Sequence, residues 1–436
     1  MIQSHAYSAI ESESASGPRL VFAALIFNLV LCLITTRGGI HMSNAIVAVA
    51  ELLIMSIGLL TIRHRITPRV VQVMGMITVF LVGMKLLNPG LDLKIVHDLG
   101  IMYIFYELGM MSTQQTANRL VWLVMMIVVG FGLFELILPN IYVTFFDIWT
   151  YYVDKGVISA STINYSNTGF FVSGDRAGQL SRTFFPSLLG PHRVSSVFLE
   201  PVSMGNFSVI IFAWCLSTRL DLSFKKLFLY GLAAFCFVLG DSRFASGCWM
   251  LMLLLRMTPL YRSSFVVFCM PLVAVLGLVF AGSIHALPGV SPSIMEDDFG
   301  GRLLFSGRLL DYWQPEQWFA LAPSQVYTAD TGYAYVINNL SLPLALFCLA
   351  IFAFNRPRTD EAASMKAMIA VYMATSLCIG ANMFTIKTAG LMWFLYGAAN
   401  VLPGAVALPS FLRLRGSVGF ALPALAGDVR SSARES

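Results

Sequence analysis

The sequence predicts an all-α polytopic membrane protein with a GT-C-like arrangement of helices, and three observations support this. Of the 436 residues, 57% are hydrophobic and only 12% are charged, which is about half the charged fraction of ordinary soluble domains. Apolar runs long enough to cross a bilayer recur along the chain. The basic residues cluster in short stretches between these runs, which is a topology signal and gives no reason to expect a nucleic-acid partner. We expect a single integral membrane domain over residues 1–436.

A spanning helix needs about 20 apolar residues, and this rule predicts twelve spans. They fall near residues 20–36, 44–62, 70–87, 95–112, 120–138, 203–218, 227–241, 244–258, 264–283, 336–354, 367–385 and 388–405. The first span is expected to be retained, because its apolar run is too long for a usual signal peptide and no AxA-like site follows it.

The connecting loops predict that both termini are cytoplasmic. With the N-terminus inside, the inner loops are RHRITPR, STQQTANR, STRLDLSFKK, RMTPLYRSS and NRPRTDEAASMK, all containing Arg or Lys. The short outer loops hold only Arg37, Lys94, Arg243 and Lys387. This distribution agrees with the positive-inside rule.

Two long connections, residues 139–202 and 284–335, fall on the outer side, and loops of this length are usually functional or disordered. The first begins with the aromatic, amphipathic stretch IYVTFFDIWTYYV, which we expect on the membrane surface. The second contains EDDFGGRLLFSGRLLDYWQPEQWF, which we expect to form one or two short helices.

Metal and redox motifs are absent from the sequence pattern, so we expect no cofactor. The seven cysteines lie in or beside apolar runs, and the six histidines lack zinc-binding spacing. The acidic run at residues 296–298 is more typical of a solvated surface than of a cation site. Glu51, Glu107 and Glu135 lie in or near spans, where an acid is either functional or a structural partner.

A set of arginines lies on the expected outer side, where the positive-inside tendency does not favour them. They are Arg176, Arg182, Arg193, Arg243, Arg302 and Arg308. The planar guanidinium suits phosphate because it forms two parallel charge-assisted hydrogen bonds. These arginines therefore suggest an anionic ligand, although arginines in long loops are often simply solvated. Arg243 is the strongest candidate, because it sits in the short turn GDSRFASG between two spans.

The stretch HRVSSVFLEPVSMGNF places Glu200 and Pro201 at the start of a span. A carboxylate there favours the helix dipole, and proline fits the first helical turn, so the pair has a purely structural explanation. The alternative is that Glu200 faces the same site as Arg193 and handles a proton.

Four segments resemble bacterial Wzy-type polysaccharide polymerases, within the O-antigen ligase and polymerase superfamily. RVSSVFLEPVSMGNF resembles their arginine-to-Glu-Pro motif, and GDSRFASG resembles their later turn with an arginine among small residues. GRLLDYWQ and TADTGYAYVINNLSLPLAL resemble the segments that end their second large loop. The order and spacing match over about residues 185–350, and the Glu-Pro pair fits the exopolysaccharide branch best.

The resemblance implies an enzyme of the bacterial inner membrane that joins oligosaccharide repeat units carried on undecaprenyl pyrophosphate. Arg193, Arg243 and Arg308 would bind the pyrophosphate, with Arg302, Arg176 and Arg182 as further substrate contacts. Glu200 would serve as general base or orient the acceptor, with Asp330 as second choice. The aromatic side chains of Tyr333, Trp313 and Trp318 would stack on sugars. The arginines would replace a metal, which implies metal-independent transfer. A flippase and a chain-length regulator are the implied protein partners.

The sequence departs from the family at Thr331, where an asparagine is usual, which weakens the role given to Asp330. Three other functions stay open. An O-antigen ligase-type glycosyltransferase would need a catalytic histidine, for which only His192 and His285 are available. A lipid-linked sugar transporter or flippase fits twelve spans, but the sequence shows neither paired halves nor uniformly short outer loops. A non-catalytic scaffold would not need the outer arginines.

Overall fold

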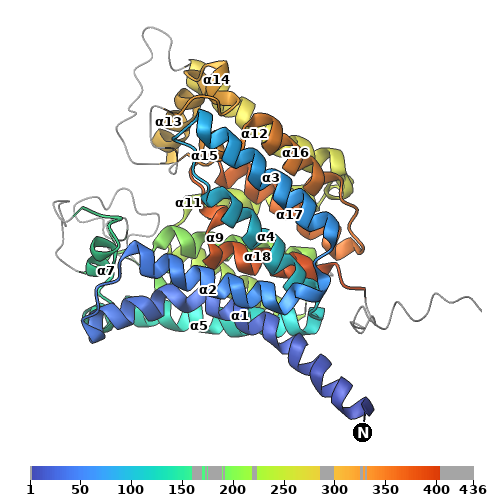
Figure 1. Cartoon of the computed structure of the whole chain (residues 1–436). Coiled ribbons are helices and arrows are strands. Elements are labelled where there is room, and N and C mark those ends of the chain that lie inside the picture. The colour runs from blue at the N-terminus through green and yellow to red at the C-terminus, as the bar shows by residue number, and fades with distance from the viewer. Residues whose placement is uncertain are drawn as a thin grey trace, which may run out of the picture.

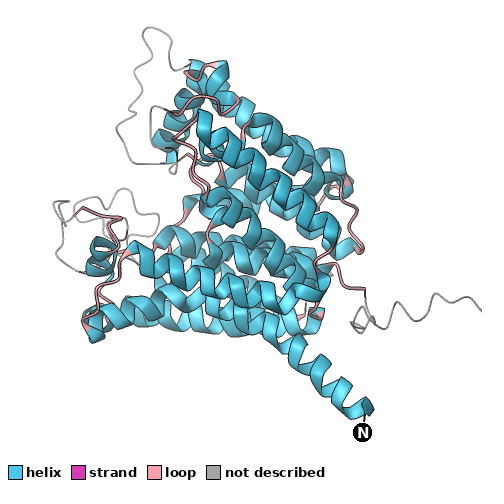
Figure 2. Ribbon diagram, in the orientation of Figure 1, coloured by secondary structure: helices cyan, strands magenta, loops and turns pink. Residues whose placement is uncertain are grey.

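The described residues of this computed structural model form a bundle of helices, with no strand among them (Figure 2). The structure describes residues 2–159, 169–171, 174, 189, 192–218, 223–284, 299–324, 328 and 331–402, with side chains from residue 16 onward. The first half of the bundle comprises α1 (Ile2–Gly38), α2 (Asn44–Ile62), the 3-10 helix η1 (Arg63–Arg65), α3 (Pro68–Leu87), α4 (Lys94–Met110), α5 (Gln114–Ile137), α6 (Pro139–Phe145) and α7 (Ile148–Asp154).

The second half begins near the end of the first long connection. It comprises η4 (Ser196–Phe198), α9 (Pro201–Ser217), α10 (Phe224–Leu239), α11 (Arg243–Arg256), η5 (Pro259–Arg262), α12 (Ser264–Ile284), α13 (Phe299–Asp311), α14 (Pro315–Trp318), α15 (Gly332–Leu340), α16 (Leu342–Phe354), α17 (Asp360–Ser376), η6 (Asn382–Phe384) and α18 (Ile386–Ala399). The prediction of short helices in the second long connection is confirmed by α13 and α14.

Among the described helices, five are long and apolar enough to cross a membrane, and a bent pair makes a sixth if it counts as one span. A helix nevertheless lies at each of the twelve expected positions. The span expected at 336–354 is broken: α15 and α16 meet at 106°. Ser341 takes a left-handed φ of 68° at the break. Pro343 has no N–H to donate to the carbonyl oxygen of Asn339, four residues before it, so α15 cannot continue through this position.

The centre of the bundle is formed by α9, α17 and α18. Every residue of α18 is buried, and so is every residue of α9 except Val202. In contrast, α2 and α3 expose large apolar side chains such as Leu60, Val79 and Leu86. Exposed apolar surface on this scale is what a lipid environment accommodates and water does not. The outer helices of the bundle are therefore suited to contact lipid.

Two glycines allow α4 and α18 to approach backbone to backbone. A Cβ at Gly109 would overlap the carbonyl oxygen of Phe394, and a Cβ at Gly397 would overlap that of Tyr106. Small residues at such crossings are a common packing device between membrane helices. This contact holds the central helix α18 against the first half of the chain.

The short helices beside the two long connections lie at one end of the bundle (Figure 1). There α7, α13 and α14 are found, opposite the end at which α1 begins. We refer to this as the loop end. The first residues of α9, α11 and α18 also meet at the loop end, as the contacts described below show.

Candidate functional site

The segment His192–Glu200 is folded into a junction between α5, α7, α9, α18 and the α10–α11 turn. Its residues Val194–Leu199 are fully buried. Ser196 and Leu199 take left-handed φ angles of 53° and 62°, which are uncommon for residues other than glycine and cost free energy. The surrounding contacts must therefore hold this backbone in place.

Glu135, near the end of α5, supplies one of those contacts. Its carboxylate accepts hydrogen bonds from the backbone N–H of Ser195 at 2.9 and 3.0 Å and of Ser196 at 2.6 Å. The ring Nε2 of His192 lies 2.8 Å from the same carboxylate. The Glu135 side chain is completely buried. The sequence left open whether Glu135 is functional or structural. In the structure, its hydrogen-bond partners are His192, Ser195 and Ser196 of the candidate segment.

Arg193 connects the segment to the α10–α11 turn. Its guanidinium donates hydrogen bonds to the carbonyl oxygen of Gly240 from Nε at 3.1 Å and from a terminal nitrogen at 2.9 Å. A further contact reaches the carbonyl oxygen of Asp241 at 3.5 Å. Arg193 is only 8% exposed. These hydrogen bonds favour a role in which Arg193 holds the α10–α11 turn in place, rather than one in which its only contact is with a ligand.

The turn held by Arg193 presents Arg243 to the outside. Arg243 is the first residue of α11 and is exposed. The side chain of Ser242 caps the helix by accepting from the N–H of Ala245. A Cβ at Gly205 of α9 would overlap Ser242, so α9 and the turn pack in direct contact. The segments that carry Arg193, Glu200 and Arg243 thus meet at one junction.

Glu200 lies at the start of α9 with its carboxylate in a polar cluster. Tyr152 donates to it at 2.5 Å, Ser203 at 2.9 Å and Lys387 at 2.8 Å. Burial by itself raises the pKa of Glu200, but the charge of Lys387 and these hydrogen bonds outweigh burial and lower the pKa from 4.5 to about 2. A carboxylate with so low a pKa is a weak base, so the geometry favours the orienting role for Glu200.

Lys387 is the residue that sequence reasoning missed. It is buried at the start of α18, with 6% of its side chain exposed, and also contacts the carbonyl oxygen of Phe198 at 3.3 Å. The sequence placed it in a short outer loop, as one of the few basic residues there. A lysine beside the last apolar run was the available signal for a functional or paired charge. Its partner, Glu200, could not be identified because it lies 187 residues away in the sequence.

The described arginines of the second long connection lie on α13. Arg302 is exposed and Arg308 is partly buried. The helix packs closely on α12, where a Cβ at Gly282 would overlap the backbone of Gly307. Figure 1 shows α13, the helix that carries both arginines, at the loop end.

The aromatic candidates differ in exposure. Trp313 and Tyr333 are each 7% exposed, and the hydroxyl of Tyr333 donates to the carbonyl oxygen of Ala374 at 3.2 Å. Trp318 is partly buried and meets Trp313 edge-to-face, with ring centroids 5.9 Å apart. In this conformation Trp318 is the one of the three with the most accessible ring for a sugar.

Several predicted residues lie outside the described part of the chain. They are Arg176, Arg182 and Asp330, together with His285 and the acidic run 296–298. Within the described ranges, no group of three or more metal-ligating side chains is found.

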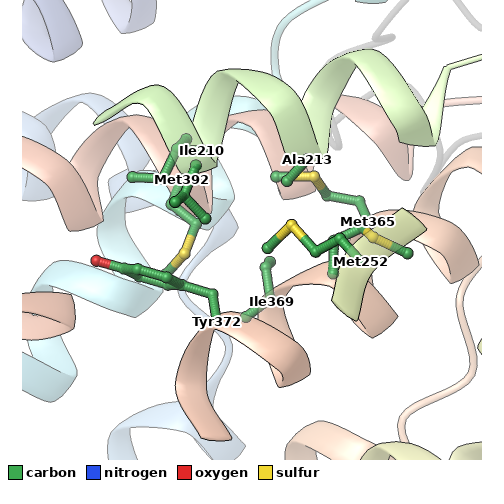
Figure 3. A pocket seen from close by; sticks show the side chains of 9 residues that line it. Ile210, Ala213, Met252, Met365, Ile369, Tyr372 and Met392 are labelled. Atoms are coloured by element: carbon green, nitrogen blue, oxygen red, sulfur yellow. The ribbon is translucent and has the colours of Figure 1, made fainter. Parts of the chain in front are cut away.

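Below the junction, the bundle is closed by close packing. Four methionines line a gap between α9, α11, α17 and α18 together with Ile210, Ile369 and Tyr372 (Figure 3). The gap has no room for a water-sized molecule. This part of the bundle core therefore offers no space for a ligand.

Comparisons with protein-family models, with curated proteins and with solved structures found no match for this chain.

Proposed function

We propose that this protein is a membrane glycosyltransferase that polymerises undecaprenyl-pyrophosphate-linked oligosaccharide units at the outer face of a bacterial inner membrane. The observation that carries the proposal is the junction at the loop end. Arg193 fixes the turn that presents Arg243, and Glu200 lies in the same junction. The resemblance of HRVSSVFLEP and GDSRFASG to polymerase motifs supplies the substrate class.

The proposal takes all twelve expected helices as spans, with both termini in the cytoplasm. The loop end is then the outer face, where the lipid-linked substrate would be found. The Arg- and Lys-rich loops lie on the opposite side, which satisfies the positive-inside rule.

The transfer needs a cationic site for the leaving pyrophosphate, because negative charge develops there in the transition state. Arg243 is suited to this role, since it is exposed at the positive end of the α11 dipole. Arg308 and Arg302 on α13 are further cations at the same end. The Glu200 carboxylate, held in its charged form by Lys387, would accept a hydrogen bond from a sugar hydroxyl and orient it.

The test is the size distribution of polysaccharide made in a strain that lacks its own polymerase. Wild-type protein should produce a ladder of long chains. Arg243→Gln should lower chain production by about 100-fold or more and accumulate single lipid-linked units, since one lost transition-state contact costs roughly that much. Arg193→Lys and Glu200→Gln should also accumulate single units.

Arg37→Gln is the matched control. Arg37 is exposed at the loop end and stacks on the ring of Phe145 at 4.3 Å, so its loss should leave the ladder intact. Equal amounts of each variant in the membrane must be confirmed. Normal ladders from Arg243→Gln, Arg193→Lys and Glu200→Gln would refute the assignment of the site. Movement of lipid-linked units across the membrane without any ladder would favour a transporter.

A further inference from the structure

The His192–Glu135 pair has the arrangement of an oriented imidazole. The Glu135 carboxylate already accepts from two backbone N–H groups, so it is suited to accept a hydrogen from Nε2 of His192, at 2.8 Å. Assigning that hydrogen to Nε2 from the hydrogen-bond network leaves Nδ1 as the acceptor nitrogen of a neutral ring. A carboxylate that fixes the tautomer of a histidine is a recurring feature of proton-transfer sites.

The Nδ1 atom of His192 is buried and has no hydrogen-bond partner. The hydroxyl of Ser195, three residues along, is likewise buried and unpartnered. Leaving a buried polar group unpaired costs free energy, so each requires an explanation. The ring of Phe170 covers one face of the imidazole, with ring centroids 4.2 Å apart. The side chain of His192 as a whole retains 16% exposure, so the ring is not completely enclosed.

Glu200 differs from His192 in its capacity to take a proton. The Glu200 carboxylate accepts three hydrogen bonds, one of them from a charged lysine, whereas Nδ1 of His192 has an unused lone pair. A neutral imidazole nitrogen with an unused lone pair is a suitable general base.

The geometry points to His192, oriented by Glu135, as the general base of the transfer. This inference rests on the proposed function. In the step, the bond between the acceptor oxygen and the anomeric carbon forms as the bond from that carbon to the pyrophosphate oxygen breaks. The pyrophosphate leaves with the electron pair. The acceptor hydroxyl gives its proton to Nδ1, and the resulting imidazolium is stabilised by the negative charge of Glu135.

The described groups around the ring are consistent with this role. From α5, Glu135 is the charged group in contact with it. From α6, Tyr142 stacks on Phe170 and donates to the carbonyl oxygen of Ser196. The neighbouring guanidinium of Arg193 is directed at the carbonyls of Gly240 and Asp241. Loss of the base should therefore be measurable without removing these supports.

The test compares wild type with His192→Gln, in purified protein supplied with a lipid-linked oligosaccharide. Glutamine can still donate an N–H to Glu135 but cannot act as a base. Turnover should fall by about 100-fold or more, while the melting temperature changes little. The wild-type rate should fall on acidification, because a protonated Nδ1 can no longer accept a proton, and the residual rate of His192→Gln should lack this fall.

His41→Gln is the matched control, because His41 also pairs with a carboxylate, that of Asp154 at 2.8 Å, but is 87% exposed. It should keep the wild-type rate and pH profile. A His192→Gln rate within about threefold of wild type would overturn the inference, since a general base contributes roughly 100-fold or more. A flat wild-type pH profile would also overturn it, even if the variant failed to fold. If wild type transfers no sugar at all, the proposed function fails instead.

Discussion

Replacing Lys387 by methionine should destabilise the folded protein by about 3 kcal/mol or more and abolish polymer formation. The substitution leaves the Glu200 carboxylate without its cation, and breaking a buried ion pair from one side typically costs about 3–5 kcal/mol. The two side chains are 6% and 26% exposed, so solvent screens the pair only weakly. Thermal unfolding in detergent, followed by tryptophan fluorescence, measures the loss.

The matched control is Lys94→Met, which removes an exposed lysine at the start of α4 and should leave the melting temperature nearly unchanged. The double variant Glu200→Gln with Lys387→Met should recover much of the lost stability, because no unpaired charge remains. A double variant no more stable than Lys387→Met alone would contradict the ion-pair explanation.

The same pair determines how stability responds to acid. The folded pKa of Glu200 is lowered from 4.5 to about 2, so the stabilisation is fully present above about pH 4.5. It is lost as the pH falls from there toward 2, because protonation removes the charge that faces Lys387. The double variant should lack this component of acid destabilisation.

Gly397→Leu should prevent α4 and α18 from packing and leave little folded protein in the membrane. A Cβ at this position would overlap the carbonyl oxygen of Tyr106 and lie within 2.9 Å of the backbone nitrogen of Met110. Backbone atoms cannot rotate away as a side chain can, so the two helices would have to separate. The expected cost is about 3 kcal/mol or more, at or above the upper end of ordinary overpacking.

The matched control is Gly75→Leu on α3, where nothing lies within 4 Å of an added Cβ. That variant should yield as much monodisperse protein as wild type when membranes are extracted and the extract is run on size-exclusion chromatography in detergent. A well-folded Gly397→Leu protein would show that the α4–α18 contact is not closely packed.

The helices were predictable from the sequence because each depends on a local run of apolar residues. The apolar run at 44–62 predicted both ends of α2. The break at Ser341 was not predicted, because α15 and α16 together read as one apolar run, although Pro343 was a signal within it. Helix lengths were also imprecise, as α1 begins at Ile2, well before the apolar run.

The candidate site was predictable in part. Arg193, Glu200 and Arg243 were chosen from motifs, and the structure places all three at one junction. The partners of Glu200, Arg193 and the adjacent His192 were not predictable, because each comes from a distant element. They are Lys387, Gly240 and Glu135, respectively. Such pairs depend on how the helices pack across the bundle. The hydrophobic periodicity of a single sequence does not predict this packing.

The most direct test of the central claim is elongation by purified protein in lipid vesicles. The vesicles would contain an undecaprenyl-pyrophosphate-linked oligosaccharide and a metal chelator, with Arg243→Gln as the comparison. The account predicts that wild type forms longer lipid-linked chains and releases undecaprenyl pyrophosphate in equal number to the new linkages, while Arg243→Gln forms few. The account would be contradicted if folded protein failed to elongate the repeat unit that supports polymer formation in cells, both with and without a divalent ion. Elongation only after a divalent ion is added would contradict the metal-independent mechanism.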